Sequence, residues 1–537
     1  MVSPREGRPV KVLVADPLSD AGVEALSSDF DVDVRTGLDK SQLLDIIGDY
    51  DAVVVRSQTT IDAELIDAAS KLQVIARAGI GLDNVDVDAA TTRGVLVCNA
   101  PQSNVISAAE HTVALLLSLA RRIPGADATL RGGQWRRSEF QGTELHDKTL
   151  GVVGLGRVGV LVAQRLTAFG MRVAAYDPFV SSERAARMGV DLVPTVGQLC
   201  ELADVLTVHL PKIAETTGIV GHEELQRMKP SSLVVNTARG GIVDEDALHQ
   251  ALSEGWIAGA ALDVFDEEPT TDSPLFKLSN TVVTPHLGAS TAEAQDKAGT
   301  MVADAVKLAL AGEVVPSAVN LQMGAGVPEP IKPYLPLAEA LGWLLAELHS
   351  GQANELAAEY LGWIAEHDTQ GLTLSALKGL LSGVVSEWVT YVNAPLLAEE
   401  RGLKVSARTS SSAEDFLSLV RLSAGDAQVA GTVVGPPSRP RLVSVWDFGL
   451  DMELSQHMVF FRYIDRPGIV ARIGQWMGDA NVNIASMQLG RRTAGGDALI
   501  AMSVDSPVDD ALVRAVGEDI GALDARGVNL PDRLFGE

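Results

Sequence analysis

The sequence predicts an α/β protein. Two doubly wound parallel-sheet domains, one inserted in the other, precede an α+β domain and a small C-terminal βαββαβ domain. The length of 537 residues indicates three or four domains, because one hydrophobic core rarely organises so long a chain. Short apolar runs alternate with helical spacing up to about residue 311, which is typical of parallel sheets. Beyond Asn320 the pattern changes to helical stretches and then to strand-like runs such as 429–434 and 441–446.

The first series of strands is short and mostly apolar, as expected of strands buried on both faces. Its five runs are Val10–Ala15, Asp31–Arg35, Ala52–Val55, Gln73–Ala76 and Val95–Cys98. A helix over 105–122 leaves this series, and a helix from 288 to about 311 returns to it. We therefore expect residues 1–103 and 292–320 to form one domain, with residues 104–291 inserted as a second.

A second series of strands and helices begins at Thr149. Its six expected strands are Leu150–Val153, Arg172–Tyr176, Val205–His209, Leu233–Asn236, Gly259–Val264 and Thr281–Thr284. The first strand runs into Gly154-Leu-Gly-Arg-Val-Gly159, a pattern that permits a tight turn, a close approach of pyrophosphate and close helix–strand packing. The next strand ends at Asp177, where a carboxylate can hold both ribose hydroxyls and repel a 2′-phosphate. The sequence therefore predicts NAD as the cofactor.

Three polar segments follow strands of this second series, so they should meet at one edge of the sheet. They carry Arg239, Glu268 and His286. Hydride transfer at a carbinol carbon needs a group that exchanges the hydroxyl proton, and an imidazole does so near neutral pH. Glu268 would stabilise the imidazolium, and Arg239 would clamp a substrate carboxylate and polarise its carbonyl. Singly these residues are unremarkable surface or loop side chains; together they predict a dehydrogenase site.

Several motifs together resemble those of the D-isomer-specific 2-hydroxyacid dehydrogenases. They are Gly151–Gly159, Asn236–Leu248 (NTARGGIVDEDAL), Leu262–Pro269 (LDVFDEEP) and Pro285–Thr291 (PHLGAST). In addition, Val54–Thr59, Arg77–Val85 and Asn104–His111 fit the substrate-domain loops of that family. The similarity runs over nearly the whole chain and is greatest to the long form of the family. Residues 321–454, with the run TYVNAPLLAEERGLKV, resemble its intervening domain, and residues 455–537 resemble an ACT regulatory domain.

This resemblance implies NAD-dependent oxidation of 3-phospho-D-glycerate to 3-phosphohydroxypyruvate, the first committed step of L-serine biosynthesis, by a cytoplasmic homo-oligomer such as a tetramer. It makes 1–103 plus 292–320 the substrate-binding domain and 104–291 the NAD-binding domain. The cofactor contacts that it implies are Gly154, Gly156, Arg157, Val158, Gly159, Asp177, Leu210, Ala238, Asp263, His286 and Gly288. Ile80 and Leu210 stand where relatives carry Thr, so a hydroxyl contact there is lost or is made by the backbone.

An anionic substrate needs arginines placed locally, because the chain carries a net charge of −27. The expected substrate contacts are Arg56, Ser57, Arg77, Gly79, Asn104 and Arg239. Arg56 and Arg77 end adjacent strands across the expected cleft from His286; alternatively, their stems merely cover apolar surface. The loop at Trp135-Arg136-Arg137 resembles one that reaches a neighbouring subunit in this family. It would either add positive charge to the cleft of that subunit or serve only as a dimer contact.

The C-terminal domain carries two loops that resemble the effector loops of ACT domains. The expected effector contacts are Tyr463, Asp465 and Asn483. Asp465 would hold an ammonium and Asn483 a carboxylate or hydroxyl, which makes L-serine the expected effector. The alternative is an ordinary Asp-Arg-Pro-Gly turn without a ligand.

Composition disfavours other classes of function. A pI near 4.7 argues against nucleic-acid binding, no apolar run is long enough for a membrane span, and the two cysteines and nine histidines show no metal-ligand spacing.

Two alternatives to this function stay open. One is another D-2-hydroxyacid dehydrogenase, a hydroxypyruvate or glyoxylate reductase, which the long C-terminal part disfavours. The other is a non-catalytic NAD(H)-sensing interaction module.

Overall fold

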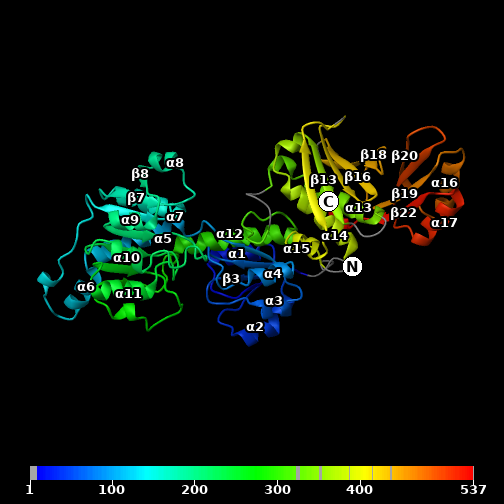
Figure 1. The fold of residues 1–537 in the computed structure, drawn as a ribbon. Helices are drawn as coiled ribbons and strands as arrows, with labels where there is room; N and C mark the ends of the chain where they lie inside the picture. Colours follow the sequence, from blue (N-terminus) through cyan, green and yellow to red (C-terminus); the bar gives the residue numbers. More distant parts are fainter. Residues whose placement is uncertain are drawn as a thin grey trace.

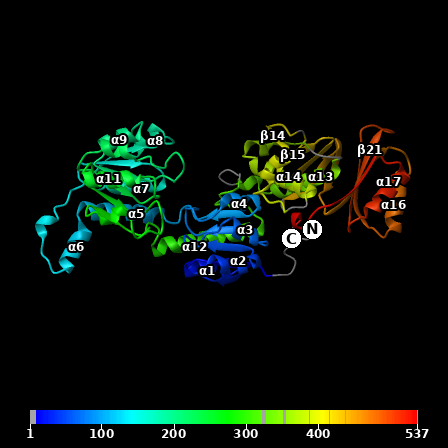
Figure 2. The same ribbon diagram turned by 60° about the horizontal axis from the view of Figure 1, so that its bottom comes forward.

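The computed structural model describes residues 9–321, 327–349, 354–385, 388–413, 415–435 and 438–535. Within these ranges the chain builds four sheets in succession. The molecule is elongated: the second sheet lies at one end, the first sheet in the middle, and the two C-terminal sheets at the other end (Figures 1 and 2).

The first sheet has five parallel strands in the order β2-β1-β3-β4-β5. They are β1 (Lys11–Val14), β2 (Asp31–Val34), β3 (Ala52–Val55), β4 (Val74–Arg77) and β5 (Leu96–Asn99), with α1 (Asp20–Ser27), α2 (Lys40–Ile46), α3 (Ala63–Ala68) and α4 (Val87–Thr92). The much later α12 (Ala292–Ala311) packs against α1, where a Cβ on Gly22 would lie 2.7 Å from the Cα of Gly299. One core thus joins residues from both sides of the inserted segment, whose exact boundaries stay predictions.

The second sheet has seven parallel strands in the order β12-β11-β10-β9-β6-β7-β8. They are β6 (Thr149–Val153), β7 (Arg172–Tyr176), β8 (Val190–Leu192), β9 (Val205–Val208), β10 (Leu233–Asn236), β11 (Gly259–Leu262) and β12 (Thr281–Val283). Its helices are α5 (Val105–Ala120), α6 (Ile123–Arg131), α7 (Arg157–Thr167), α8 (Ser182–Arg187), α9 (Val196–Leu202), α10 (His222–Arg227) and α11 (Glu245–Glu254). The strand order reverses at β6, which opens a crevice at the carboxyl ends of β6 and β9, where ligands bind in such sheets. The sequence missed only the edge strand β8, which is three residues long with a central Asp191.

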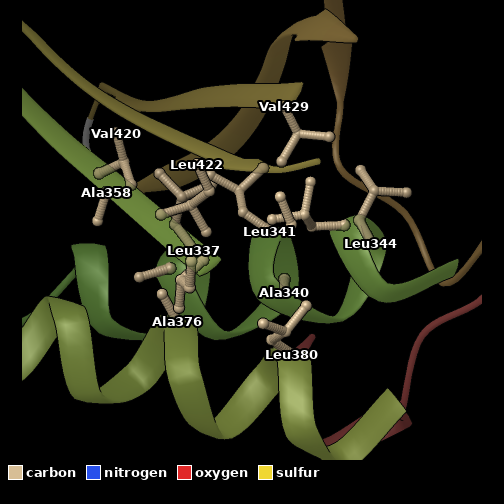
Figure 3. Close-up of a cluster of buried hydrophobic side chains, with 14 of the residues drawn as sticks. Leu337, Ala340, Leu341, Leu344, Ala358, Ala376, Leu380, Val420, Leu422 and Val429 are labelled. Atoms are coloured by element: carbon tan, nitrogen blue, oxygen red, sulfur yellow. The ribbon is translucent and has the colours of Figure 1, made fainter. Parts of the chain in front are cut away.

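The third sheet is mixed, in the order β14-β13-β15-β16-β17-β18. Its strands are β13 (Glu355–Gly362), β14 (Lys404–Ser410), β15 (Ser418–Ala424), β16 (Ala427–Val434), β17 (Arg439–Val445) and β18 (Phe448–Glu453). Beside it lie α13 (Tyr334–Leu348), α14 (Gln370–Val384) and α15 (Ala394–Glu400). Leu337, Leu341 and Leu344 of α13 meet the apolar face of this sheet, and Ala340 lies toward Leu380 of α14 (Figure 3).

The fourth sheet is antiparallel, in the order β20-β21-β19-β22. The chain order β19 (His457–Ile464), α16 (Ile469–Asp479), β20 (Ile484–Arg491), β21 (Asp497–Val504), α17 (Asp510–Ile520) and β22 (Asp524–Asn529) is the predicted βαββαβ pattern. Both helices cover one face, whereas Met458, Phe460 and Leu499 belong to the core of α13. Helix α13 therefore lies between the third and fourth sheets and joins them. None of the helices in the described ranges is both long and apolar enough to cross a membrane.

Candidate active site

The turn between β6 and α7 has the geometry of a pyrophosphate cradle. Gly154 has φ 94°, and an added Cβ would lie 2.7 Å from the carbonyl oxygen of His209. Gly159 packs directly on the carbonyl of Gly154, again without room for a side chain. Gly156 caps the N-terminus of α7, and a Cβ there would meet open space. The backbone at Gly156 is therefore open to an anion, at the positive end of α7.

A cavity of about 600 Å³ lies beside this turn. Its lining includes Gln102, Ile106, Gly156, Arg157, Asp177, Phe179, Arg184 and Lys297. Asp177 follows β7, and its two carboxylate oxygens accept hydrogen bonds from the backbone of Leu155 at 2.8 Å and of Phe179 at 2.9 Å. A carboxylate oxygen accepts more than one hydrogen bond, so both can also bind ribose hydroxyls. The cavity and its carboxylate fit the adenosine half of a dinucleotide.

The remaining predicted cofactor contacts lie around the same crevice. Val158 is in the first turn of α7, Leu210 follows β9 with its side chain against Gly154, and Ala238 follows β10. All three are half-buried. The residues present at this crevice thus fit the pyrophosphate of NAD and the groups on either side of it.

His286 and Glu268 form a close pair at the carboxyl ends of β12 and β11. The Nδ1 of His286 lies 2.6 Å from Oε2 of Glu268, and Oε1 of Glu268 accepts the N–H of Phe265 at 2.8 Å. Burial alone would raise the pKa of Glu268, but the hydrogen bonds from His286 and Phe265 outweigh it and lower the pKa. Glu268 is therefore an anion at neutral pH, and the Nε2 of His286 is left for a substrate. The His286 side chain is 45% exposed, so a ligand can reach it.

Two arginines approach one another across the domains. Arg77 ends β4, and Arg239 follows β10 and lies 3.6 Å from Asp83 of the first domain. A Cβ on Gly79 would collide with the Arg77 guanidinium, and a Cβ on Gly81 with that of Arg239. The glycines of Arg77-Ala-Gly-Ile-Gly81 therefore make room for both cations. Burial, and after it the charge of Arg239, lowers the pKa of Arg77 to about 10.

Two of the predicted substrate contacts have a buried polar atom without a partner among the described residues. Within the described part of the chain, neither the Nε of Arg77 nor the Oδ1 of Asn104 has a hydrogen-bond partner. Such atoms are costly unless a ligand or water satisfies them. Arg56 follows the neighbouring strand β3 and is half-buried, and Ser57 beside it is exposed. The backbone N–H of Arg56 donates to the carboxylate of Asp16 at 2.6 Å.

Three residues of the site were missed or assigned a different role by sequence. Asp16 is 2% exposed and holds the loop at 56–59 through its carboxylate. Asp263, expected as a cofactor contact, is fully buried, and its carboxylate binds the backbone of Leu287 and Gly288. His111 on α5 binds that same carboxylate. The motif Asn104–His111 ends at this residue, but it was assigned no role from the sequence, because a histidine on a helix is normally read as a packing or surface residue.

The structure separates two of the three predicted effector contacts. Asp465 follows β19 and Asn483 precedes β20, and the central strand β21 lies between these strands. Ile464 pairs with Asp497 and Ile484 with Val504, so the two sites lie at opposite ends of β21, roughly 23 Å apart at the usual rise per residue. One small ligand cannot contact both within a single chain, so the effector site stays a prediction that requires two chains. Tyr463 is 1% exposed, so its ring belongs to the core.

The loop with Trp135 protrudes from the second domain, as expected. Trp135 is 83% exposed, and a cavity of about 690 Å³ is lined by Trp135, Arg137, Ser138, Phe140 and Gln141. This loop shares no lining residue with the cavity beside Asp177.

Family models match three regions of the chain. Residues 113–288 match the NAD-binding domain of D-isomer specific 2-hydroxyacid dehydrogenases, residues 330–446 the intervening domain of D-3-phosphoglycerate dehydrogenase, and residues 457–521 the ACT domain. Among solved structures, the TT0316 protein of Thermus thermophilus is 34% identical with a TM-score of 0.54, and covers 58% of this chain and all of that one. A glyoxylate/hydroxypyruvate reductase of Sinorhizobium meliloti, solved with NADP and malonate, is 30% identical with a TM-score of 0.53, over 58% of this chain and 97% of that one.

Curated relatives match almost end to end. The D-3-phosphoglycerate dehydrogenase of Mycobacterium tuberculosis is 48% identical over 97% of this chain and 99% of its own length. The enzyme of the same name from Methanocaldococcus jannaschii is 41% identical over 97% of this chain and all of its own. With this crevice, this Arg–Glu–His arrangement and matches over both C-terminal domains, the chain belongs to the D-3-phosphoglycerate dehydrogenases, within the D-isomer specific 2-hydroxyacid dehydrogenase family.

Proposed function

We propose that this protein oxidises 3-phospho-D-glycerate to 3-phosphohydroxypyruvate with NAD, as the first committed step of L-serine biosynthesis. The observation that carries the proposal is the pair of guanidiniums of Arg77 and Arg239, for which Gly79 and Gly81 leave room. A substrate with a carboxylate and a phosphate would satisfy two such cations. The unpartnered Nε of Arg77 can donate to one of its oxygens, and the unpartnered Oδ1 of Asn104 can accept from its hydroxyl.

In the proposed reaction, the Nε2 of His286 takes the hydroxyl proton as the hydrogen on the same carbon leaves as hydride. Bound NAD supplies the hydride acceptor. Glu268 stabilises the imidazolium that results, because its carboxylate already binds Nδ1 at 2.6 Å. Arg239 holds the substrate carboxylate and polarises the developing carbonyl.

The other D-2-hydroxyacid dehydrogenases are the enzymes to exclude by experiment. Solved structures such as the glyoxylate/hydroxypyruvate reductase resemble only 58% of this chain, whereas residues 330–446 and 457–521 match domains beyond that part. Absorbance at 340 nm should rise with NAD and 3-phospho-D-glycerate, and far less with glycerate or lactate. His286→Ala should still bind NADH, by its fluorescence, but should lose turnover. NADH binding by the parent without turnover of any 2-hydroxy acid would instead support a non-catalytic sensor.

The proposal also covers the regulation, assembly and location of the protein. The ACT domain indicates a small-molecule effector, and we propose L-serine, with Asp465 on its ammonium. Because Asp465 and Asn483 lie at opposite ends of β21, a site using both needs two chains, which supports a homo-oligomer, proposed as a tetramer. We also propose a cytoplasmic location. Cys98 and Cys200 are both free and buried, which suits a reducing compartment.

A further inference from the structure

The buried carboxylate of Asp263 organises the loop that carries His286. Its Oδ1 accepts the N–H of Leu287 at 2.7 Å and its Oδ2 that of Gly288 at 2.8 Å, and its carbonyl oxygen accepts the N–H of His286 at 2.8 Å. Burial would raise the pKa of Asp263, but hydrogen bonds from His111, Thr284 and Leu287 lower it. The loop is thus folded around a fully buried anion.

His286 needs this support because its backbone is left-handed, with φ 54°. A non-glycine residue adopts that conformation only where the surroundings hold it. The same turn places the imidazole against Glu268. Any residue that fixes the Asp263 carboxylate therefore also fixes the direction of the imidazole.

His111 is such a residue, and it comes from a distant element. It lies on α5, the helix that leads from the first sheet into the second domain, and its Nε2 is 3.1 Å from Oδ1 of Asp263 and 3.1 Å from Oγ1 of Thr284. Thr284 donates its own hydrogen to Asp263 at 2.6 Å, so its oxygen is left to accept. The Nε2 of His111 must then carry the hydrogen, shared between the two oxygens.

We propose that His111 is a positioning residue for the reaction. It orients Asp263, and Asp263 holds the left-handed His286 loop in the geometry that proton transfer needs. Among the described residues, the hydrogen bonds of the His111 ring go to Asp263 and Thr284 and not to Glu268 or His286, so it acts through the loop that Asp263 organises. The inference rests on the proposed function for its kinetic consequence, whereas the loop geometry is independent of any substrate.

Two substitutions at position 111 separate positioning from packing. His111→Phe keeps the ring but removes the donor, whereas His111→Gln can place an amide N–H near the position of Nε2. We expect kcat to fall by about 10- to 100-fold in His111→Phe, since small misplacements of reacting groups have effects of this size. We expect NADH affinity to change less than about twofold and His111→Gln to recover most of kcat. His146→Phe, at an exposed histidine of the same domain, is the matched control and should behave as the parent.

A second measurement needs no turnover. Hydrogen exchange of the segment 284–291 should be faster in His111→Phe than in the parent, and near the parent rate in His111→Gln. If His111→Phe does not fold, Thr284→Val removes another donor to Asp263 and should give the same local increase. Equal kcat and equal exchange in the parent and the donor-free variants would overturn the proposal. A parent that oxidises no 2-hydroxy acid would overturn the proposed function instead, and the exchange result would still decide the role of His111.

Discussion

At the scale of residues, Glu268 accepts two hydrogen bonds at once, and one of them keeps a proton on the Nδ1 of His286. One oxygen binds the N–H of Phe265 and the other the Nδ1 of His286. In Glu268→Gln, one of these donors must face an amide NH2 group, so either the backbone bond is lost or the imidazole takes the wrong tautomer. We expect kcat in steady-state assays to fall by about a hundredfold or more. An unchanged kcat in Glu268→Gln would mean that Glu268 does not act on His286.

Asp177 decides the choice of dinucleotide if its carboxylate binds the ribose. Asp177→Ala should lower the preference for NAD over NADP, measured as the ratio of the two kcat/KM values, by about tenfold, as expected for a lost bond to a charged group. Asp177→Asn keeps the shape of the side chain and isolates the effect of charge. A ratio that stays constant in both variants would contradict the ribose assignment.

Some residues of the site could be predicted from the sequence, and others could not. Arg239, Glu268 and His286 each follow a strand of the second sheet, and parallel strands bring such positions to one edge. His111 and Asp16 bind other residues of the chain, so the chemistry of a substrate or cofactor did not point to them. Their hydrogen bonds join residues forty or more positions apart, which only the fold reveals.

At the scale of elements, the packing of α13 on α14 encloses an ion pair. Lys378 donates to Glu339 at 2.9 Å, and their side chains are only 11% and 5% exposed. Lys378→Met should destabilise this helix pair by about 3 kcal/mol, because it leaves a buried carboxylate without its main counter-charge. Hydrogen exchange of residues 334–348 and 370–384 measures this locally, since a multidomain chain need not unfold in one step.

The double variant tests whether the effect comes from the unpaired charge. Replacing both members, as Glu339→Met with Lys378→Met, should restore most of the lost stability, because apolar pairs of similar volume often substitute well for buried ion pairs. A double variant as unstable as Lys378→Met alone would indicate that packing, not charge, is what the single variant loses.

Strands were harder to predict than helices in the third sheet. The strand β14 is exposed at nearly every position, so it has no apolar alternation, and β13 (ELAAEYLG) is rich in helix-forming residues. Both become strands by pairing: β14 pairs with β13 at the edge of the sheet, and β13 pairs with β15 on its other side. The two parallel sheets were predicted almost completely, because most of their strands are continuous apolar runs that alternate with helices; β2 (DVDV) and β8 (VDL) are the exceptions.

At the scale of the whole molecule, the candidate cleft lies between two domains that contact each other through charged groups. Arg239 of the second domain lies 3.6 Å from Asp83, whose side chain is 73% exposed, so this ion pair is weak and readily exchanged for a substrate anion. At the other end of the chain, α13 lies in one core with both C-terminal sheets. The ACT domain and the intervening domain are therefore joined by packed side chains of one core.

The effector assignment is a prediction at this scale, because its site needs more than one chain. L-serine should inhibit the parent enzyme, and Asp465→Ala should raise the serine concentration for half-inhibition by about tenfold or more, since a carboxylate–ammonium bond is lost. Each variant is compared with its own uninhibited rate, and light scattering at the assay concentration gives the number of chains. Asp479→Ala, at an exposed carboxylate in the last turn of α16, should respond to serine as the parent does. Unaltered inhibition in Asp465→Ala would move the effector away from this loop, and inhibition of a monomer would contradict a site shared between chains.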